Sequence, residues 1–139
     1  MMSDPQTSFP YEMETYGVVI RVLPEYVDQQ SSPHDREFVW RYTIEIENGI
    51  EETIQLLRRH WIITDVKGRR QEVKGEGVVG EQPILHPGER YVYASGCPLT
   101  EPSGMMMGSF TMRREDGEEF IVKIPAFSLD SPHDRATMN

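Results

Sequence analysis

The fold is decided by the stretch FVWRYTIEIE at residues 38–47. Large apolar side chains occupy every second position of this stretch, and the positions between them are mostly polar or charged. The alternating apolar residues are Phe38, Trp40, Tyr42, Ile44 and Ile46. Because successive side chains of a β-strand point to opposite faces, the pattern predicts a long strand with one face in a core and the other in water.

The two-residue period continues on both sides of this stretch. Further strands are expected near residues 18–22, 54–66, 89–96, 106–112 and 120–124, with 71–78 as a weaker one. Turn signals separate them, and Asp116-Gly117 is the clearest hairpin signal. No segment shows a convincing helical pattern. About seven strands punctuated by turns predict an all-β fold, an antiparallel β-sandwich of the immunoglobulin or fibronectin type III kind.

The length of the chain, 139 residues, fits one domain. Both ends of the sequence are polar, and Pro5 and Pro10 lie in the first ten residues. We therefore expect a flexible N-terminal tail at 1–10, the sandwich domain at 11–130 and a flexible C-terminal tail at 131–139.

The composition narrows the classes of partner. The net charge is −9, from 23 acidic and 14 basic residues, and the basic residues form no patch in the sequence. An acidic surface repels phosphate backbones, so no nucleic-acid partner is expected. The single cysteine, Cys97, excludes an intramolecular disulfide and fits a reducing compartment. With no secretory signal and no apolar run long enough for a membrane span, we expect a cytoplasmic protein without a membrane partner.

The strand order predicts which loops meet. In an up-and-down sandwich, alternate connections lie at opposite ends. One end should carry the loops near 48–53, 75–88 and 115–118. The other should carry those near 28–36, 66–70 and 97–104, together with the C-terminal tail.

A glycine motif, GEGVVG at residues 75–80, provides the candidate ligand-binding residues Gly75, Gly77 and Gly80. In dinucleotide-binding folds such glycines close a strand-to-helix turn and direct helix N-terminal amides at a pyrophosphate. Here prolines at 83 and 87 follow the motif, and no helix does. The context therefore excludes a Rossmann-type site.

Three interpretations of these glycines remain open: a structural strand end, a ligand loop whose amides form an anion nest, and a partner epitope. Carboxylates expected at the same end would oppose an anion, since two unit charges about 4 Å apart interact by roughly 4 kcal/mol at an effective dielectric near 20. Pyrophosphate is then expected only with a bridging divalent cation. The acidic residues concerned are Glu51, Glu52, Glu76, Glu81, Asp116, Glu118 and Glu119.

The pentapeptide Ser-Pro-His-Asp-Arg occurs twice, at residues 32–36 and 131–135. Both copies should lie at the end opposite the glycines. Imidazole and carboxylate groups can bind a transition metal, but Ser-Pro-x-Asp is also ordinary turn chemistry. Both interpretations stay open, and we commit to no metal ligand.

Neither the methionine cluster nor the cysteine indicates catalysis. In Met105-Met106-Met107, we expect Met106 inside and its neighbours outside, where they could contact a partner. Nothing in the sequence positions His60 or His86 against Cys97 as a nucleophile–base pair. No catalytic residue and no cofactor is therefore predicted.

Several long segments resemble the ApaG family. They are residues 60–65 (HWIITD), 75–83 (GEGVVGEQP), 104–108 (GMMMG) and 120–127 (FIVKIPAF). The resemblance covers about residues 11–130 and implies a fibronectin type III-like sandwich. It also implies that the glycine motif is a family feature for which pyrophosphate or nucleotide binding is an option, with a link to magnesium and cobalt homeostasis.

Similar domains in larger proteins act as interaction modules, and the family supplies no catalytic residues. We therefore expect a non-enzymatic module that binds a protein partner, as a monomer or a homodimer. Binding of a divalent cation or pyrophosphate at Gly75, Gly77 and Gly80 is the alternative.

Overall fold

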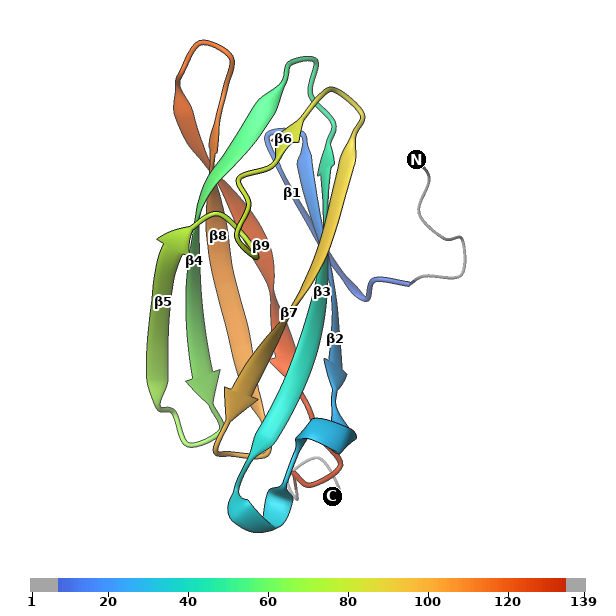
Figure 1. Ribbon diagram of the computed structural model, residues 1–139, viewed down its shortest axis with the longest axis vertical. Helices are drawn as coiled ribbons and strands as arrows, with labels where there is room; N and C mark the ends of the chain where they lie inside the picture. Colours follow the sequence, from blue (N-terminus) through green and yellow to red (C-terminus); the bar gives the residue numbers. More distant parts are fainter. Residues whose placement is uncertain (1–7, 135–139) are drawn as a thin grey trace.

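Two antiparallel sheets packed face to face form the protein (Figure 1). The computed structural model describes residues 8–134 of the chain. The first sheet has the strand order β1-β2-β3-β7, with bounds Tyr11–Thr15, Val18–Tyr26, Phe38–Asn48 and Arg90–Leu99. The second has the order β5-β4-β8-β9, with bounds Arg70–Glu76, Ile54–Asp65, Gly104–Arg113 and Glu119–Leu129, and the short β6 (Ile84–Leu85) pairs with β4.

The expected antiparallel sandwich is confirmed, and all seven expected strands are present. Two further strands, β1 and β6, escaped the sequence analysis. The central residues of β1 are exposed, so the strand has no apolar alternation, and β6 is only two residues long. Two single turns of 3-10 helix, Asp28–Gln30 and Pro33–Asp35, are the only helical segments within residues 8–134. None of the helices described is long and apolar enough to cross a membrane.

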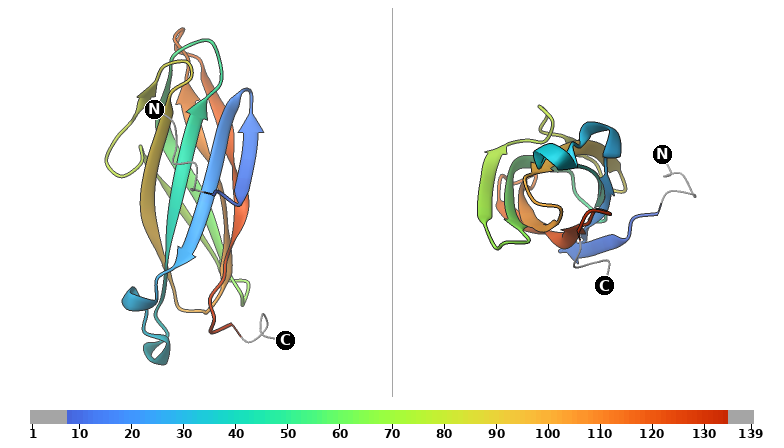
Figure 2. Two further views of the ribbon diagram at one scale, coloured as in Figure 1. Left: turned by 90° about the vertical axis from the view of Figure 1, so that its right-hand side faces the viewer. Right: turned by 90° about the horizontal axis from the view of Figure 1, so that it is seen from below.

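The connections gather at two ends of the sandwich (Figures 1 and 2). The lower end carries both 3-10 turns, the connections at 66–69 and 100–103, and residues 130–134. The upper end carries the connections at 49–53 and 114–118. The glycine segment differs from expectation, because β5 ends at Glu76 partway up the flank and the chain reaches the upper end only through β6.

The core lies between the sheets and is built largely from β3 and the strands facing it. All five alternating apolar residues of β3 are buried, and Trp40 is 1% exposed. The indole Nε1 of Trp40 donates to the carbonyl of Asp130 at 2.8 Å, which ties β3 to the end of β9. Phe110 and Phe127 complete the interior from the second sheet.

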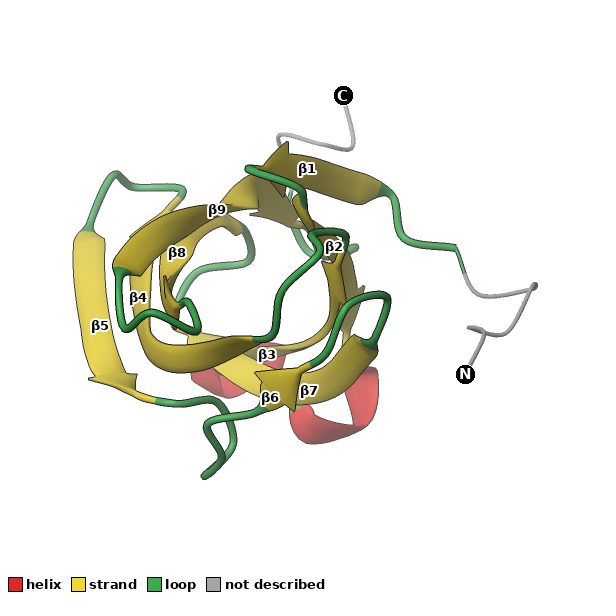
Figure 3. Cartoon of the chain, turned by 90° about the horizontal axis from the view of Figure 1, so that it is seen from above, coloured by secondary structure: helices red, strands yellow, loops and turns green. Residues whose placement is uncertain are grey.

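One side of the sandwich is closed and the other is open (Figure 3). On the closed side β1 lies along β9, where the backbone N–H of Lys123 donates to Thr15 Oγ1 at 3.2 Å and that of Ser128 to the Tyr11 hydroxyl at 3.3 Å. On the open side the edges are β5 and β7. Neither edge pairs with a further strand among residues 8–134.

Part of the expected C-terminal tail packs against the domain. Ser131 and Asp134 are buried, and the His133 ring lies 5.7 Å from Tyr26 and 6.1 Å from Phe38 between centroids. The ordered chain therefore extends beyond the expected boundary at residue 130, because these side chains cover the lower end of the core. The remaining tail segments, 1–7 and 135–139, lie outside the described residues.

Candidate functional site

The glycine motif forms a tight hairpin on the flank of the second sheet. Val78 and Glu81 exchange both backbone hydrogen bonds, at 2.8 and 2.9 Å. The central residues Val79 and Gly80 have φ of 43° and 84°, the positive values that a type I′ turn requires. Left-handed φ is strained for the β-branched Val79, which is exposed, whereas Val78 is fully buried in the core. The hairpin thus anchors one valine and presents the other to solvent.

Gly77 is needed for a close backbone approach, and Gly75 leaves room for the Arg59 side chain. A Cβ at Gly77 would lie 2.3 Å from the carbonyl oxygen of Glu81, and φ at Gly77 is 63°. A Cβ at Gly75 would lie 2.7 Å from Nη2 of Arg59. Three amides of the segment, those of Gly77, Val78 and Glu81, already donate to backbone carbonyls. This geometry supports the structural interpretation of the motif.

The Arg59 guanidinium lies against Gly75. Its Nη1 donates to the carbonyls of Glu76 and Gly77, at 2.9 Å each. Its Nε and Nη2 have no hydrogen bond to any residue in the part of the chain described. The Tyr93 hydroxyl is buried and has no hydrogen-bond partner among those residues, and this burial raises the pKa of Tyr93 despite the opposing charge of Arg59. Sequence reasoning identified neither group.

A basic hollow of about 340 Å³ opens beside this segment. Arg58, Arg59 and Lys74 line it together with Gly75 and one carboxylate, that of Glu76. Three of the other carboxylates expected around the glycines pair with arginines, one of them with Arg58 of the hollow itself. Glu52 and Glu118 pair with Arg114 at the upper end, and Glu119 pairs with Arg58. The lining is therefore more basic than the sequence predicted.

No metal centre emerges from the described residues. Within 8–134 no group of three or more His, Cys, Asp or Glu side chains is arranged to hold a metal ion. Both copies of the Ser-Pro-His-Asp segment do lie at the lower end, as expected (Figure 1). In the first copy Ser32 Oγ donates to Asp35 at 2.7 Å, and in the second the His133 ring packs on aromatic side chains. These contacts are those of turns and packing.

An apolar surface lies on the outer face of the second sheet, near the lower end. Met106 is 1% exposed, whereas Met105 and Met107 are 45% and 44% exposed, so the expected orientation of the methionine cluster is confirmed. The register places Ile62 beside Met107, and Val66 is 51% exposed nearby. Together Ile62, Val66, Met105 and Met107 form the methionine face, which borders a hollow of about 450 Å³.

The outer face of the first sheet is ionic by contrast. Arg21 and Arg90 both reach the carboxylate of Glu45, which is 1% exposed, and also that of Glu47. Charged side chains thus cover this face and satisfy one another. Only the second sheet presents neighbouring exposed methionines.

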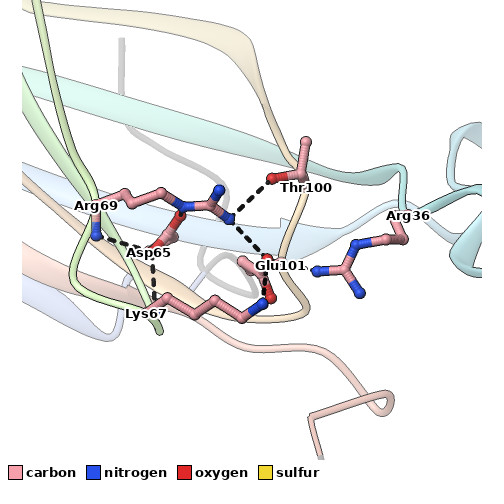
Figure 4. A network of polar contacts seen from close by, with 6 residues as sticks. All are labelled: Arg36, Asp65, Lys67, Arg69, Thr100 and Glu101. Atoms are coloured by element: carbon pink, nitrogen blue, oxygen red, sulfur yellow. Dashed lines mark hydrogen bonds and ion pairs between the residues drawn. The ribbon is translucent and has the colours of Figure 1, made fainter.

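A buried carboxylate organises the lower end (Figure 4). Glu101 is 3% exposed and pairs with Arg36 at 2.5 Å, Arg69 at 2.7 Å and Lys67 at 3.4 Å. Burial acts to raise the pKa of Glu101, but the hydrogen bond from Arg36 and the charges of Arg36 and Lys67 outweigh it and lower that pKa. Sequence reasoning missed this network, since its members come from three separate connections.

The described residues show no catalytic arrangement around Cys97. The thiol is buried, and desolvation raises its pKa to about 11, which disfavours the reactive thiolate at neutral pH. Of the two histidines considered as its partner, His60 bonds Glu72 at 2.5 Å and His86 contacts Thr53 Oγ1 at 3.0 Å. Neither is a base for the thiol.

The fold and these surfaces define a fibronectin type III-like β-sandwich with a methionine face and a glycine hairpin beside a basic hollow. A sequence model of the ApaG domain matches residues 28–114. The chain is 56% identical over 129 residues to Protein ApaG of Paramagnetospirillum magneticum, covering 93% of this chain and 99% of that protein. The same protein of Brucella canis is 51% identical, with the same coverage. The chain belongs to the ApaG family.

Solved structures agree with this assignment. A crystal structure of an ApaA protein from Bordetella pertussis superposes with a TM-score of 0.81 at 43% identity, covering 90% of this chain and 100% of that chain. The C-terminal domain of Wzt gives a TM-score of 0.52 at 11% identity, covering 89% of this chain and 78% of that chain. The second likeness concerns the fold alone.

Proposed function

We propose that this protein is a non-enzymatic cytoplasmic module that binds a protein partner through its methionine face. The observation that supports this proposal is the cluster of the exposed Val66, Met105 and Met107 with the half-buried Ile62, at and beside the paired strands β4 and β8. Exposed apolar side chains that lie together favour a protein contact more than scattered ones do. Methionine side chains are flexible and polarizable, so they adapt to an apolar partner surface.

The negative charge of the chain indicates which kind of protein partner fits this face. The chain carries a net charge of −9, and the exposed Asp130 borders the methionine face. An apolar segment flanked by basic side chains complements this surface best, because complementary charge raises the association rate and rejects acidic competitors.

Site-specific photo-crosslinking tests the proposal. A photoreactive residue at position 107 should capture a defined protein in native cytoplasm, whereas the same probe at position 92 should not. Val92 is a matched control because it is 54% exposed on the other sheet. The double variant Met105→Glu and Met107→Glu should reduce binding of the captured protein by about tenfold or more, and Val92→Glu should not. Capture of the same proteins by probes at both positions would contradict specific binding through the methionine face.

Pyrophosphate binding beside Gly75, Gly77 and Gly80 is the second candidate. The observation that favours it is the basic hollow in which Nε and Nη2 of Arg59 have no partner among the described residues. Guanidinium groups recognise phosphate oxygens with paired hydrogen bonds. The acidic surroundings expected from sequence required a bridging cation, whereas this lining offers direct contacts.

A titration of labelled protein separates these possibilities. Pyrophosphate should shift the amide signals of residues 75–80, and Arg59→Gln should abolish the shift. If magnesium or cobalt is required, the cation-bridged form of the idea is correct. Amides that stay unmoved at millimolar pyrophosphate, with and without cation, would eliminate this candidate.

A further inference from the structure

The outer edge of β5 is open to a partner strand. β5 lies at the margin of its sheet, and no strand of residues 8–134 lies beyond it (Figures 1 and 3). The view from below in Figure 2 agrees. The opposite edge of the same sheet, β9, is covered by β1. An uncovered edge presents backbone N–H and C=O groups in the alternating pattern that another strand can pair with.

The register fixes which residues of β5 face outward. Gly77 N–H donates to Leu57 at one end of the β4–β5 ladder, and Asp65 N–H donates to Arg69 at the other. Because hydrogen-bonded pairs alternate along an antiparallel ladder, the odd-numbered residues between these points direct their backbone groups to β4. The even-numbered residues direct theirs to the open edge. They are Arg70, Glu72, Lys74 and Glu76.

The same four residues alternate in charge: positive, negative, positive, negative. All four are exposed, and their charges sum to zero in a protein of net charge −9. A second copy can therefore approach this edge without local repulsion. Elsewhere, two copies with so much like charge repel each other.

We propose that β5 pairs antiparallel with β5 of a second copy, centred on Val73, so that the two sheets join across a two-fold axis. In this register Glu72 faces Lys74 of the second copy, and Arg70 faces its Glu76. Each facing pair joins opposite charges on one face of the joined sheet, which favours pairing. A two-fold interface uses the same patch of both copies, so the strand must be complementary to itself.

The neighbouring registers are all unfavourable. A shift of two residues in either direction places Glu72 against Glu72 or Lys74 against Lys74. A shift of one residue directs edge N–H groups at residues whose backbone groups already bond to β4. Parallel pairing in register sets each charge beside its own copy. The antiparallel register centred on Val73 is the one in which all four charged residues of β5 face opposite charges.

Contacts within the chain leave this pairing possible. Arg70 and Lys74 form no ion pair with any residue in the described range 8–134. Glu72 accepts a hydrogen bond from His60 on the same sheet, which holds its carboxylate on the outer face. Arg59 donates to the carbonyl of Glu76, so the central Glu72–Lys74 pairs carry most of the new backbone hydrogen bonds. The pairing uses backbone groups at the edge of β5, whereas the methionine face lies on the outer face of the same sheet, where its Ile62 is the cross-strand neighbour of Glu72.

Sedimentation velocity on the full chain tests the proposal, between about 10 μM and 1 mM protein at about 0.15 M salt, where charges are screened beyond about 8 Å. The wild type should show concentration-dependent dimers. Glu72→Lys and Lys74→Glu should each weaken dimerisation by at least about tenfold, because like charges then face each other. An equimolar mixture of the two variants should dimerise again, since positions 72 and 74 are both positive in one copy and both negative in the other.

Two control variants test whether the effect on dimerisation is specific to β5. Glu14→Lys and Lys123→Glu make the same charge changes at exposed positions away from β5 and should leave dimerisation unchanged. In the wild type, the amides of Glu72 and Lys74 should exchange with deuterium more slowly as concentration rises.

A wild type that stays monomeric at 1 mM would overturn the proposal, and so would single variants that dimerise like the wild type or a mixture that fails to recover. Met105→Glu should leave the dimer intact, so failure of the proposed function and failure of this inference are distinguishable.

Discussion

Asn48 at the upper end of the sandwich and Glu101 at the lower end are both buried polar side chains, but one is neutral and the other is charged. Asn48 is fully buried, and its Nδ2 donates to the carbonyls of Glu52 and Leu85 at 2.9 and 3.0 Å. Its Oδ1 accepts from the Ile50 N–H at 3.0 Å. One amide thus fastens the β3–β4 connection to β6 through fixed donor and acceptor positions.

Glu101 connects the loops of the lower end through charged contacts. Its carboxylate is held by three cations, Arg36, Lys67 and Arg69, whose side chains are 57%, 62% and 62% exposed. All three exposed cationic side chains contact the same carboxylate, which is buried. The Asn48 contacts therefore depend on hydrogen-bond geometry and involve no ionisable side chain, whereas the Glu101 contacts depend on the ionisation of one carboxyl group.

The largest expected effect is that of Asn48→Asp. The new carboxylate would place an oxygen against two carbonyl oxygens and bury an unpaired charge, which costs about 3–5 kcal/mol of unfolding free energy. Urea denaturation at neutral pH measures it. Gln29→Glu, the same chemical change at an exposed site, should stay within about 0.5 kcal/mol of the wild type. A loss below about 1 kcal/mol for Asn48→Asp would show that the upper end does not rely on this amide.

Glu101→Gln should have the next largest effect, and it should depend on pH. Burial opposes ionisation of Glu101, but its cationic partners prevail and hold its pKa below the ordinary value. The resulting stabilisation is complete above the ordinary carboxyl pKa and is lost as pH falls through the lowered pKa in the folded state. The wild type should therefore be more stable than Glu101→Gln at pH 7, and the difference should shrink on acidification.

Urea midpoints from neutral to acid pH measure this difference. Glu25→Gln, at an exposed position without an ion pair among the described residues, is the matched control. Parallel curves for the wild type and Glu101→Gln across the whole range would contradict the charged character of the lower end.

Removing single cations should matter less. Arg36→Gln or Lys67→Gln should each cost under about 1 kcal/mol, because both side chains are more than half exposed and the remaining cations still pair with Glu101. Thermal unfolding of both variants beside Glu101→Gln measures the order. Equal losses from Lys67→Gln and Glu101→Gln would mean that the cations are not interchangeable.

The smallest expected effect is a change in the reactivity of the Cys97 thiol. Cys97 lies opposite Trp40 in the β3–β7 pairing, so its accessibility to a reagent indicates whether the lower half of the core is closed. Its thiol is 3% exposed, and desolvation raises its pKa to about 11. Because the folded state holds this proton more tightly, the associated stability is present below the ordinary thiol pKa and declines as pH rises toward 11. Alkylation of the native protein at pH 8 should be slow and should accelerate in Glu101→Gln. Rapid labelling of the wild type would indicate an open lower end.

Much of the fold followed from local patterns. The alternation in residues 38–47 identified β3, and the positive φ of 89° at Gly117 fits the expected Asp116-Gly117 turn. The orientation of Met106 against its neighbours also followed from the period of two. β1 was missed because it lies along the edge of another strand and its central residues are exposed. It therefore has no alternation of apolar and polar residues.

The candidate site was less accessible to sequence reasoning. Gly75, Gly77 and Gly80 were identified, and two of them have positive φ, but the sequence did not predict their cationic neighbour, Arg59, whose guanidinium lies against Gly75. That neighbour depends on the β4–β5 register and on where β5 stops. The methionine face likewise needed the pairing of Ile62 with Met107 across two strands.

The sequence by itself determined the strands, their inward and outward faces and most of the turns, because these follow from side-chain period and backbone preference within a few residues. Only the tertiary structure decided that Glu101 gathers Arg36, Lys67 and Arg69, and that β5 keeps an open edge while β9, at the opposite edge of the same sheet, is covered. Both outcomes depend on contacts between residues far apart in the chain, and no local pattern encodes which of the many possible partners a charge or a strand edge will meet.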